Sequence, residues 1–169
     1  MTFPTLPDIL PGDILDAATI EEEQDGIRSL AGVFKRKTVD ETVNNTAVLQ
    51  NDDVLFVSVE ANAIYSTTLM IHYTSGATPD LKVALTYPTG LTARWRQLGY
   101  FAAALQSVQS TEAGTSALDG GTAWTVEYKG LVVVGANAGT LQLQWAQNTM
   151  NASNTSVLAG SYIELRRLS

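Results

Sequence analysis

The sequence contains no cysteine and a single histidine, His72. Without cysteine, neither disulfides nor thiolate metal sites can form, and zinc would lack its usual Cys and His ligands. His72 has no local nucleophile to activate and no acid to orient it, as a catalytic histidine would need. We therefore predict a structural or surface role for His72. We expect a protein that is not an enzyme, with no catalytic residues, no metal and no cofactor.

Basic residues are also scarce. Ten Lys and Arg stand against seventeen Asp and Glu, which gives a net charge of −7. The excess lies at the front, because residues 1–60 hold twelve acids and only four bases. Nucleic-acid binding needs clustered Lys and Arg, so we expect no nucleic-acid partner. An acidic front end suits docking onto a basic protein surface, and a solvated acidic helix face is the alternative.

Long apolar runs are missing. Runs such as residues 54–57 and 131–134 are far shorter than the roughly 20 residues of a membrane helix. The first ten residues lack a basic region followed by an apolar stretch, so we also expect no signal peptide. We therefore predict no membrane partner.

Residues 1–31 differ from the rest of the chain. Pro4, Pro7 and Pro11 restrict the first twelve residues to extended backbone. Residues 13–30 favour a short helix, in which Thr19 and Glu22 fit a capping box. Apolar residues in so short a segment cannot form a core alone, so we predict an anchoring arm and helix over 1–31. The residues that we expect to contact a partner are Pro4, Leu6, Ile9, Leu10, Ile14, Leu15, Ile20 and Ile27.

From residue 32 onward the pattern is that of β-structure. Apolar and polar residues alternate, with turn formers between the runs, which is typical of antiparallel strands with one wet face. We expect a second unit over 32–169, an all-β antiparallel sandwich or jelly roll of about eight strands. Residues 106–121 are rich in Ser, Thr, Gly and Gln and predict a long surface loop, and residues 148–155 a polar tip. The expected strands are 32–37, 42–49, 54–60, 63–73, 81–87, 91–96, 122–135, 140–147 and 156–168.

Two binding alternatives stay open. Asn51, Asp52 and Asp53 could offer oxygen ligands to calcium, although local bonding in a turn also explains them. The three tryptophans and six tyrosines could include a platform for sugars, or they could fill the core and subunit interfaces.

Two stretches carry a resemblance to a known class of protein. Residues 38–76, TVDETVNNTAVLQNDDVLFVSVEANAIYSTTLMIHYTSG, and residues 139–168, GTLQLQWAQNTMNASNTSVLAGSYIELRRL, resemble minor virion proteins of tailed bacteriophages, particularly those of actinobacteria. Residues 11–20 are similar to a short element near the start of phage fibre-type proteins, from which Asp16 and Ile20 depart.

The resemblance implies a non-enzymatic structural protein, made in the host cytoplasm and located in the virion. It implies a homo-oligomer, with a trimer expected, whose partner is the major capsid protein or another virion protein. We expect a capsid decoration protein on the head surface, anchored by residues 1–31. The alternative is a minor tail, fibre or baseplate protein that binds a host surface carbohydrate.

Overall fold

Most of the described residues lie in β-strands. A computed structural model describes residues 32–101, 104–111, 116–118 and 120–169. These residues form strands whose pairings are all antiparallel, which confirms the expected all-β class. The expected arm and helix, residues 1–31, lie outside the described residues. The strands are β1 (Val33–Arg36), β2 (Glu41–Val43), β3 (Gln50–Val59), β4 (Ile64–Ser75), β5 (Leu81–Thr86), β6 (Thr92–Phe101), β7 (Ala104–Thr111), β8 (Ser116–Leu118), β9 (Gly121–Val133), β10 (Gly139–Gln147), β11 (Thr155–Val157) and β12 (Tyr162–Arg167).

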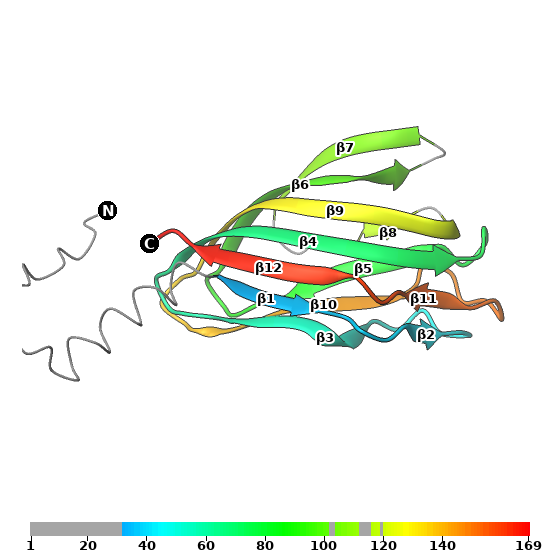
Figure 1. Cartoon of the computed structure of the whole chain (residues 1–169), viewed down its shortest axis with the longest axis horizontal. Coiled ribbons are helices and arrows are strands. Elements are labelled where there is room, and N and C mark those ends of the chain that lie inside the picture. The colour runs from blue at the N-terminus through cyan, green and yellow to red at the C-terminus, as the bar shows by residue number, and fades with distance from the viewer. Residues whose placement is uncertain (1–31, 102–103, 112–115, 119) are drawn as a thin grey trace, which may run out of the picture.

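Two sheets divide these strands (Figure 1). The larger sheet has the order β1-β12-β4-β9-β6-β7, with β11 beside β4 and β2 beside β11. The smaller sheet has the order β3-β10-β5-β8. The chain passes from one sheet to the other at every connection except β1–β2, β6–β7 and β11–β12. These connections hold the sheets together as two layers of a sandwich, as expected.

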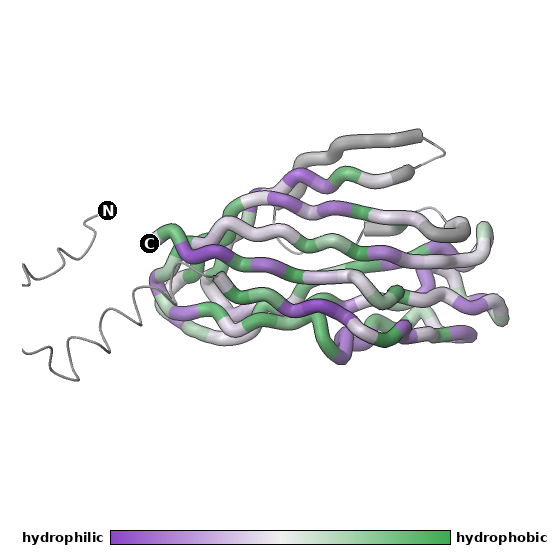
Figure 2. Tube along the Cα trace, viewed as in Figure 1, coloured by the Kyte–Doolittle hydropathy of each residue, from purple (hydrophilic) through white to green (hydrophobic). Residues whose placement is uncertain are grey.

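The core lies between the two layers. In β4 every second residue is buried, from Tyr65 through Leu69 and Ile71 to Tyr73, as a period of two requires. The smaller sheet contributes Trp145, which is 0% exposed, and the neighbouring leucines of β10. Hydrophobic and hydrophilic residues alternate along the strands in Figure 2. Such alternation fixes which face of each strand is buried, because a slip of one residue would reverse it.

Four sequence expectations were wrong in detail. The described residues form twelve strands rather than about eight. The loop expected at 106–121 contains most of β7 and all of β8, because β6 and β5 offer free edges to which even a polar segment can pair through its backbone. The expected strand 42–49 is reduced to β2, and the turn expected at 50–53 is the start of β3. That start belongs to the sheet because Gln50 and Asn51 pair with Trp145 and Gln144 of β10.

The two ends of the sandwich differ in what they carry. At one end, Leu168 N–H donates to the carbonyl of Ile64, which places the last residues of the chain there. Gly32 lies at the same end with a φ of +71°, and a Cβ there would sit 2.9 Å from the carbonyl oxygen of Leu165. The chain therefore enters the sandwich beside its C-terminus. The loops around β2 and β11 lie at the opposite end (Figure 1).

Leu143→Ala should lower the free energy of unfolding by about 2–5 kcal/mol, because Leu143 is 1% exposed and its truncation leaves a cavity. Leu131→Ala is the matched control, since Leu131 is 41% exposed, and it should change stability by no more than about 0.5 kcal/mol. Urea unfolding followed by circular dichroism measures both. Equal effects of the two substitutions would contradict the placement of the core between the layers.

Candidate interaction surfaces

The residues predicted to contact a partner all precede residue 32, so they lie outside the described residues and their role stays a prediction. What the structure offers are three features of the sandwich itself. They are the outer face of the larger sheet, a buried ionic network at one edge, and the polar end of the molecule.

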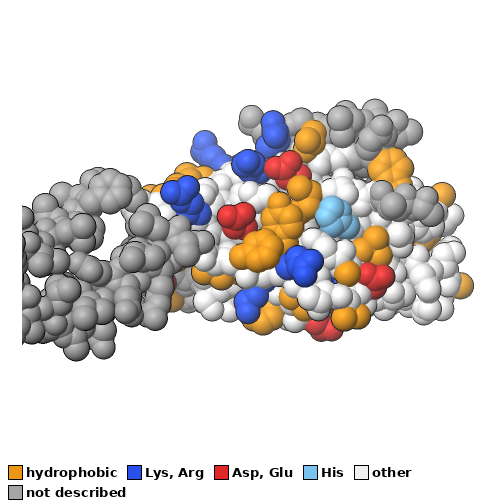
Figure 3. Space-filling view, viewed as in Figure 1, with side chains coloured by type: hydrophobic (Ala, Val, Ile, Leu, Met, Phe, Trp, Pro, Cys, Tyr) orange, Lys and Arg blue, Asp and Glu red, His pale blue; other side chains and the backbone are white. Residues whose placement is uncertain are grey.

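The outer face of the larger sheet is basic and partly apolar (Figure 3). Side chains that are paired across neighbouring strands form rows on this face, running from β12 through β4 and β9 to β6. The first row is Glu164, Thr68, Lys129 and Arg96, and it extends to Phe34 on β1. The second row is Tyr162, Met70, Glu127 and Leu98, and the third is Arg166, Ser66, Leu131 and Arg94. We call this surface the basic face. Its charged side chains are Arg36, Arg94, Arg96, Lys129 and Arg166 against Glu127 and Glu164.

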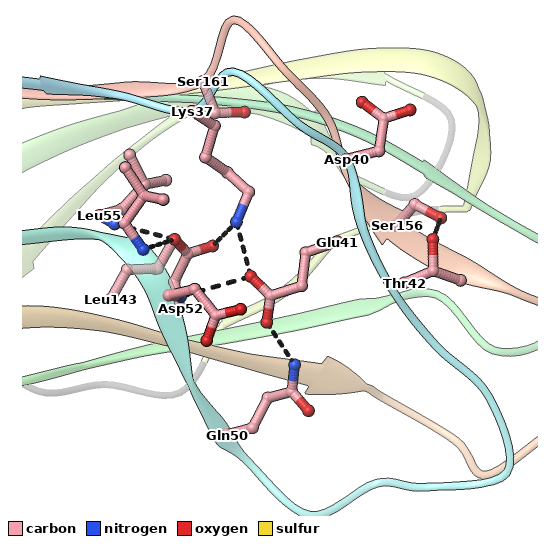
Figure 4. A network of polar contacts seen from close by, with 12 residues as sticks. Lys37, Asp40, Glu41, Thr42, Gln50, Asp52, Leu55, Leu143, Ser156 and Ser161 are labelled. Carbon is pink, nitrogen blue, oxygen red and sulfur yellow. Dashed lines mark hydrogen bonds and ion pairs between the residues drawn. The ribbon is translucent and has the colours of Figure 1, made fainter.

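A buried lysine joins the edges of the two sheets (Figure 4). Lys37 follows β1 in the larger sheet and is 1% exposed. Its Nζ donates to Oδ2 of Asp52 at 2.9 Å and to Oε2 of Glu41 at 2.5 Å. The other oxygen of Asp52, Oδ1, accepts from the backbone N–H groups of Val54 and Leu55 at 2.9 and 2.8 Å. Both buried charges are thus paired and hydrogen-bonded, as burial of ions requires.

The pairing outweighs the effect of burial on the lysine. Burial by itself lowers the pKa of Lys37, but the hydrogen bonds and negative charges of Glu41 and Asp52 raise it above the ordinary 10.5. A group whose pKa is higher in the folded than in the unfolded state stabilises the fold at pH values below its unfolded pKa. That contribution is lost as pH rises above about 10.5 through the folded value.

Lys37→Met should destabilise the protein by about 3–5 kcal/mol at neutral pH, because it leaves the buried carboxylate of Asp52 without its cation. The stability difference from wild type should shrink as pH rises above about 10.5, where the wild-type lysine also loses its charge. Lys129→Met, at an exposed position, is the control and should change stability by about 0.5 kcal/mol or less. Chemical unfolding at a series of pH values tests this, and a difference that does not depend on pH would contradict it.

The structure weighs against a calcium site at residues 51–53. Both carboxylate oxygens of Asp52 are engaged by the protein, and Asn51 Oδ1 accepts from Gln144 Nε2 at 2.8 Å. Among the described residues, no group of three or more His, Cys, Asp or Glu side chains could hold a metal ion. The single histidine is half-buried, and its Nδ1 lies 2.8 Å from Oγ1 of Thr125 on the neighbouring strand. Such a cross-strand bond is the structural role predicted for it.

At the polar end of the sandwich, one buried glutamine joins two loops. Gln147 is 0% exposed, and its Oε1 accepts from the backbone N–H groups of Thr46 and Asn151 at 3.2 and 3.0 Å. Its Nε2 donates to the carbonyl of Ser153 at 2.6 Å. We call residues 44–49 and 148–154 together the polar tip. The tip contains no charged residue and exposes amides, hydroxyls and the side chains of Val48 and Met150.

Gln147→Leu should loosen the polar tip while leaving the sandwich folded, because three backbone groups would lose their partner. Hydrogen exchange at the amides of Thr46 and Asn151 should accelerate by about tenfold or more, the equivalent of one lost bond of about 1.4 kcal/mol. Gln144→Leu, on the same strand but bonded only to Asn51, is the control and should leave these amides protected. Unchanged exchange in Gln147→Leu would show that the tip does not depend on this side chain.

Most of the aromatic residues that could have stacked on sugars fill the core. Trp95, Trp145 and Tyr73 are 7%, 0% and 1% exposed, and Trp95 also packs edge-on against Tyr128. A shallow depression lies between two turns, lined by residues 86–89 and 137–140, and Tyr87 is its one aromatic residue. Among the side chains that the structure describes, this depression therefore lacks the two or three exposed aromatics of a typical sugar platform.

Comparisons with known proteins give little further information. No protein-family model matches the chain, and no curated protein sequence matches it. One solved structure that is similar is the tripod (BppUct-A-L) from the baseplate of bacteriophage Tuc2009. It is 14% identical, with a TM-score of 0.34, over 97% of this chain and 99% of that chain. A likeness this distant carries no weight for the function. Among the described residues, no helix has the length and apolar character needed to cross a membrane.

Proposed function

We propose that this protein is a non-enzymatic structural protein of a tailed-phage virion, a trimeric decoration protein of the capsid surface. Residues 1–31 form its anchoring unit and residues 32–169 its sandwich. The contacts to the major capsid protein, or another virion protein, are made by the apolar residues of the anchor, Pro4, Leu6, Ile9, Leu10, Ile14, Leu15, Ile20 and Ile27.

The observation that carries the proposal is that the two ends of the sandwich differ: the chain enters at one end, and the polar tip lies at the other. Residue 32, where the anchor joins, lies at the end that holds the C-terminus, and the polar tip lies at the other end (Figure 1). A chain anchored through residues 1–31 would therefore hold the sandwich by one end and project an uncharged, internally bonded tip away from the particle. The resemblance of residues 38–76 and 139–168 to minor virion proteins agrees with this arrangement.

The strand order supports the more specific expectation of a jelly roll. With the hairpin β6–β7 and the short strands β2 and β11 set aside, the sheets read β1-β12-β4-β9 and β3-β10-β5-β8. This is the interleaved order of two Greek keys, in which early and late strands of the chain lie side by side. Jelly rolls occur in viral capsid proteins and in lectins, so the fold is compatible with either role and decides neither.

A second candidate is a minor tail or baseplate protein that binds a host carbohydrate. The polar tip favours it, because asparagine amides and hydroxyls can exchange hydrogen bonds with sugar hydroxyls without a desolvated charge. The burial of Trp145 and Trp95 weighs against it, since neither is available for stacking on a sugar ring.

Gold-labelled antibodies raised against the protein and applied to intact particles of the phage that encodes it distinguish these roles. Gold spread over the heads supports decoration. Gold confined to the tail or its tip overturns the capsid assignment and favours host binding. Particles that carry no gold, from lysates in which the protein is made, would remove the virion role altogether.

Anchoring has its own test. Exchange of Leu10 and Ile14 for Asp should keep the full chain soluble but prevent it from joining particles that lack it, because charge would enter an apolar contact. Val39→Asp with Val48→Asp is the matched control, since these side chains are 72% and 76% exposed on the sandwich. Co-sedimentation with particles measures both. Equal incorporation of the two double variants would contradict anchoring by residues 1–31.

A further inference from the structure

We propose that, in the free protein, the acidic segment of residues 1–31 docks onto the basic face of the same chain. The inference does not rest on the virion role, since it concerns only how two parts of this chain recognise each other.

The basic face carries charge that the described sandwich leaves uncompensated. Lys129 and Arg96 are direct cross-strand neighbours, and Arg94 lies in the next row on the same side of β6. Like charges placed opposite each other destabilise a sheet. Within the part of the chain that the structure describes, none of these three side chains makes an ion pair. The sequence thus keeps an unfavourable arrangement that an acidic partner would relieve.

Beside these bases the face presents apolar surface. Phe34 is 55% exposed, and its ring centroid lies 5.4 Å from that of Tyr162. Met70 and Leu98 follow in the row of Tyr162 across the sheet. The face therefore fits a partner that combines acidic side chains with aliphatic ones, rather than a purely acidic one. Figure 3 shows apolar side chains lying among blue and red ones on this face.

Residues 1–31 have this complementary composition. They hold seven acids and one base, and the acids are closest together at residues 21–25, next to Ile20 and Ile27. The rest of the chain is nearly neutral, with nine bases and ten acids. The segment therefore contains most of the net negative charge of the chain, and the basic face holds five of the nine bases of residues 32–169.

The tether between residues 21–25 and the sandwich is long enough for the segment to bind the basic face of its own chain. Asp25 lies seven positions before Gly32, a stretch that spans at most roughly 25 Å when it is fully extended. From the edge strand β1 to β6 there are four strand steps, roughly 19 Å at about 4.8 Å each. The proposed contact of the acids at 21–25 with Arg96 and Lys129 therefore requires residues 26–31 to be extended, so that the expected helix ends before residue 26 when the segment is docked. A short tether gives an effective concentration on the order of millimolar, which favours the intramolecular contact over one between copies.

The absence of cysteine gives a direct test on the full-length chain. A nitroxide attached at Thr68→Cys would mark the centre of the basic face, and one at Ser58→Cys would mark the opposite outer surface of the sandwich. In a ¹⁵N-labelled protein we expect the label at 68, but not the label at 58, to cause loss of amide signal in residues 1–31, strongest near 21–25. Ser66→Cys provides a second label on the same face if Thr68→Cys fails to fold.

Charge reversal supplies the matched comparison. Arg96→Glu with Lys129→Glu should restore the lost signals, and so should about 1 M salt, where the Debye length is about 3 Å. Lys35→Glu with Arg167→Glu changes the net charge equally but lies off the face, so it should leave the signal loss in place.

Three outcomes would overturn the proposal. Labels at 68 and 58 could act equally on residues 1–31, or neither could act. Signal loss that persists in Arg96→Glu with Lys129→Glu would exclude recognition by this face. A third test mixes two kinds of chain, one with the nitroxide but without ¹⁵N and the other with ¹⁵N but without the nitroxide. Equal signal loss in this mixture would show that the segment binds a second copy. None of these experiments uses phage particles, so their failure is separate from failure of the virion role.

Discussion

The burial of the Lys37 charge is the constraint on which the closed edge of the sandwich depends. Lys37 comes from the larger sheet and Asp52 from the smaller one, and each would be expensive to bury alone. Their contact therefore fixes how the end of β1 lies along the start of β3. The backbone around the lysine is held as well, since Lys37 N–H donates to Ser161 and the Lys37 carbonyl accepts from Gly160. Glu41 extends the network by accepting from Gln50 Nε2 at 2.7 Å, which ties β2 to the same edge.

The outer face of the larger sheet and the polar tip differ in the side chains that they expose. The outer face of the larger sheet is free to carry charge and exposed apolar side chains, because the core is complete without it. The far end is tied internally by Gln147, so its polar loops present amides and hydroxyls in defined positions. A surface without charge interacts weakly at long range. The tip is therefore suited to short-range contacts.

The fold leaves the choice between decoration and host binding open, because one fold class, here a β-sandwich, can serve many functions. What separates them is where side chains are placed. Trp95 and Trp145, which could have made a sugar platform, are buried in the core, whereas Phe34 and Leu131 are exposed on the basic face. That distribution favours protein contacts over sugar contacts on the sides of the sandwich.

The sequence by itself determined the all-β class of the fold and the division of residues 63–73 into two alternating faces. Both follow from the period of two, which is a local property of an extended chain. Composition also determined the concentration of acids before residue 32 and the impossibility of disulfides. These conclusions need no knowledge of which strands are neighbours.

Only the tertiary structure decided the rest. Residues 50–53 read locally as a turn, and they begin a strand because Gln50 and Asn51 pair with β10, nearly a hundred residues later. Residues 106–111 read as part of a loop, and they form a strand because the edge of β6 accepts their backbone. Arg96 and Lys129 are separated by 33 positions and become neighbours through strand order alone. The local alternation of residues indicates strands and their two faces. Long-range strand pairing decides which side chains become neighbours, and the interaction surfaces that we propose are formed by that pairing.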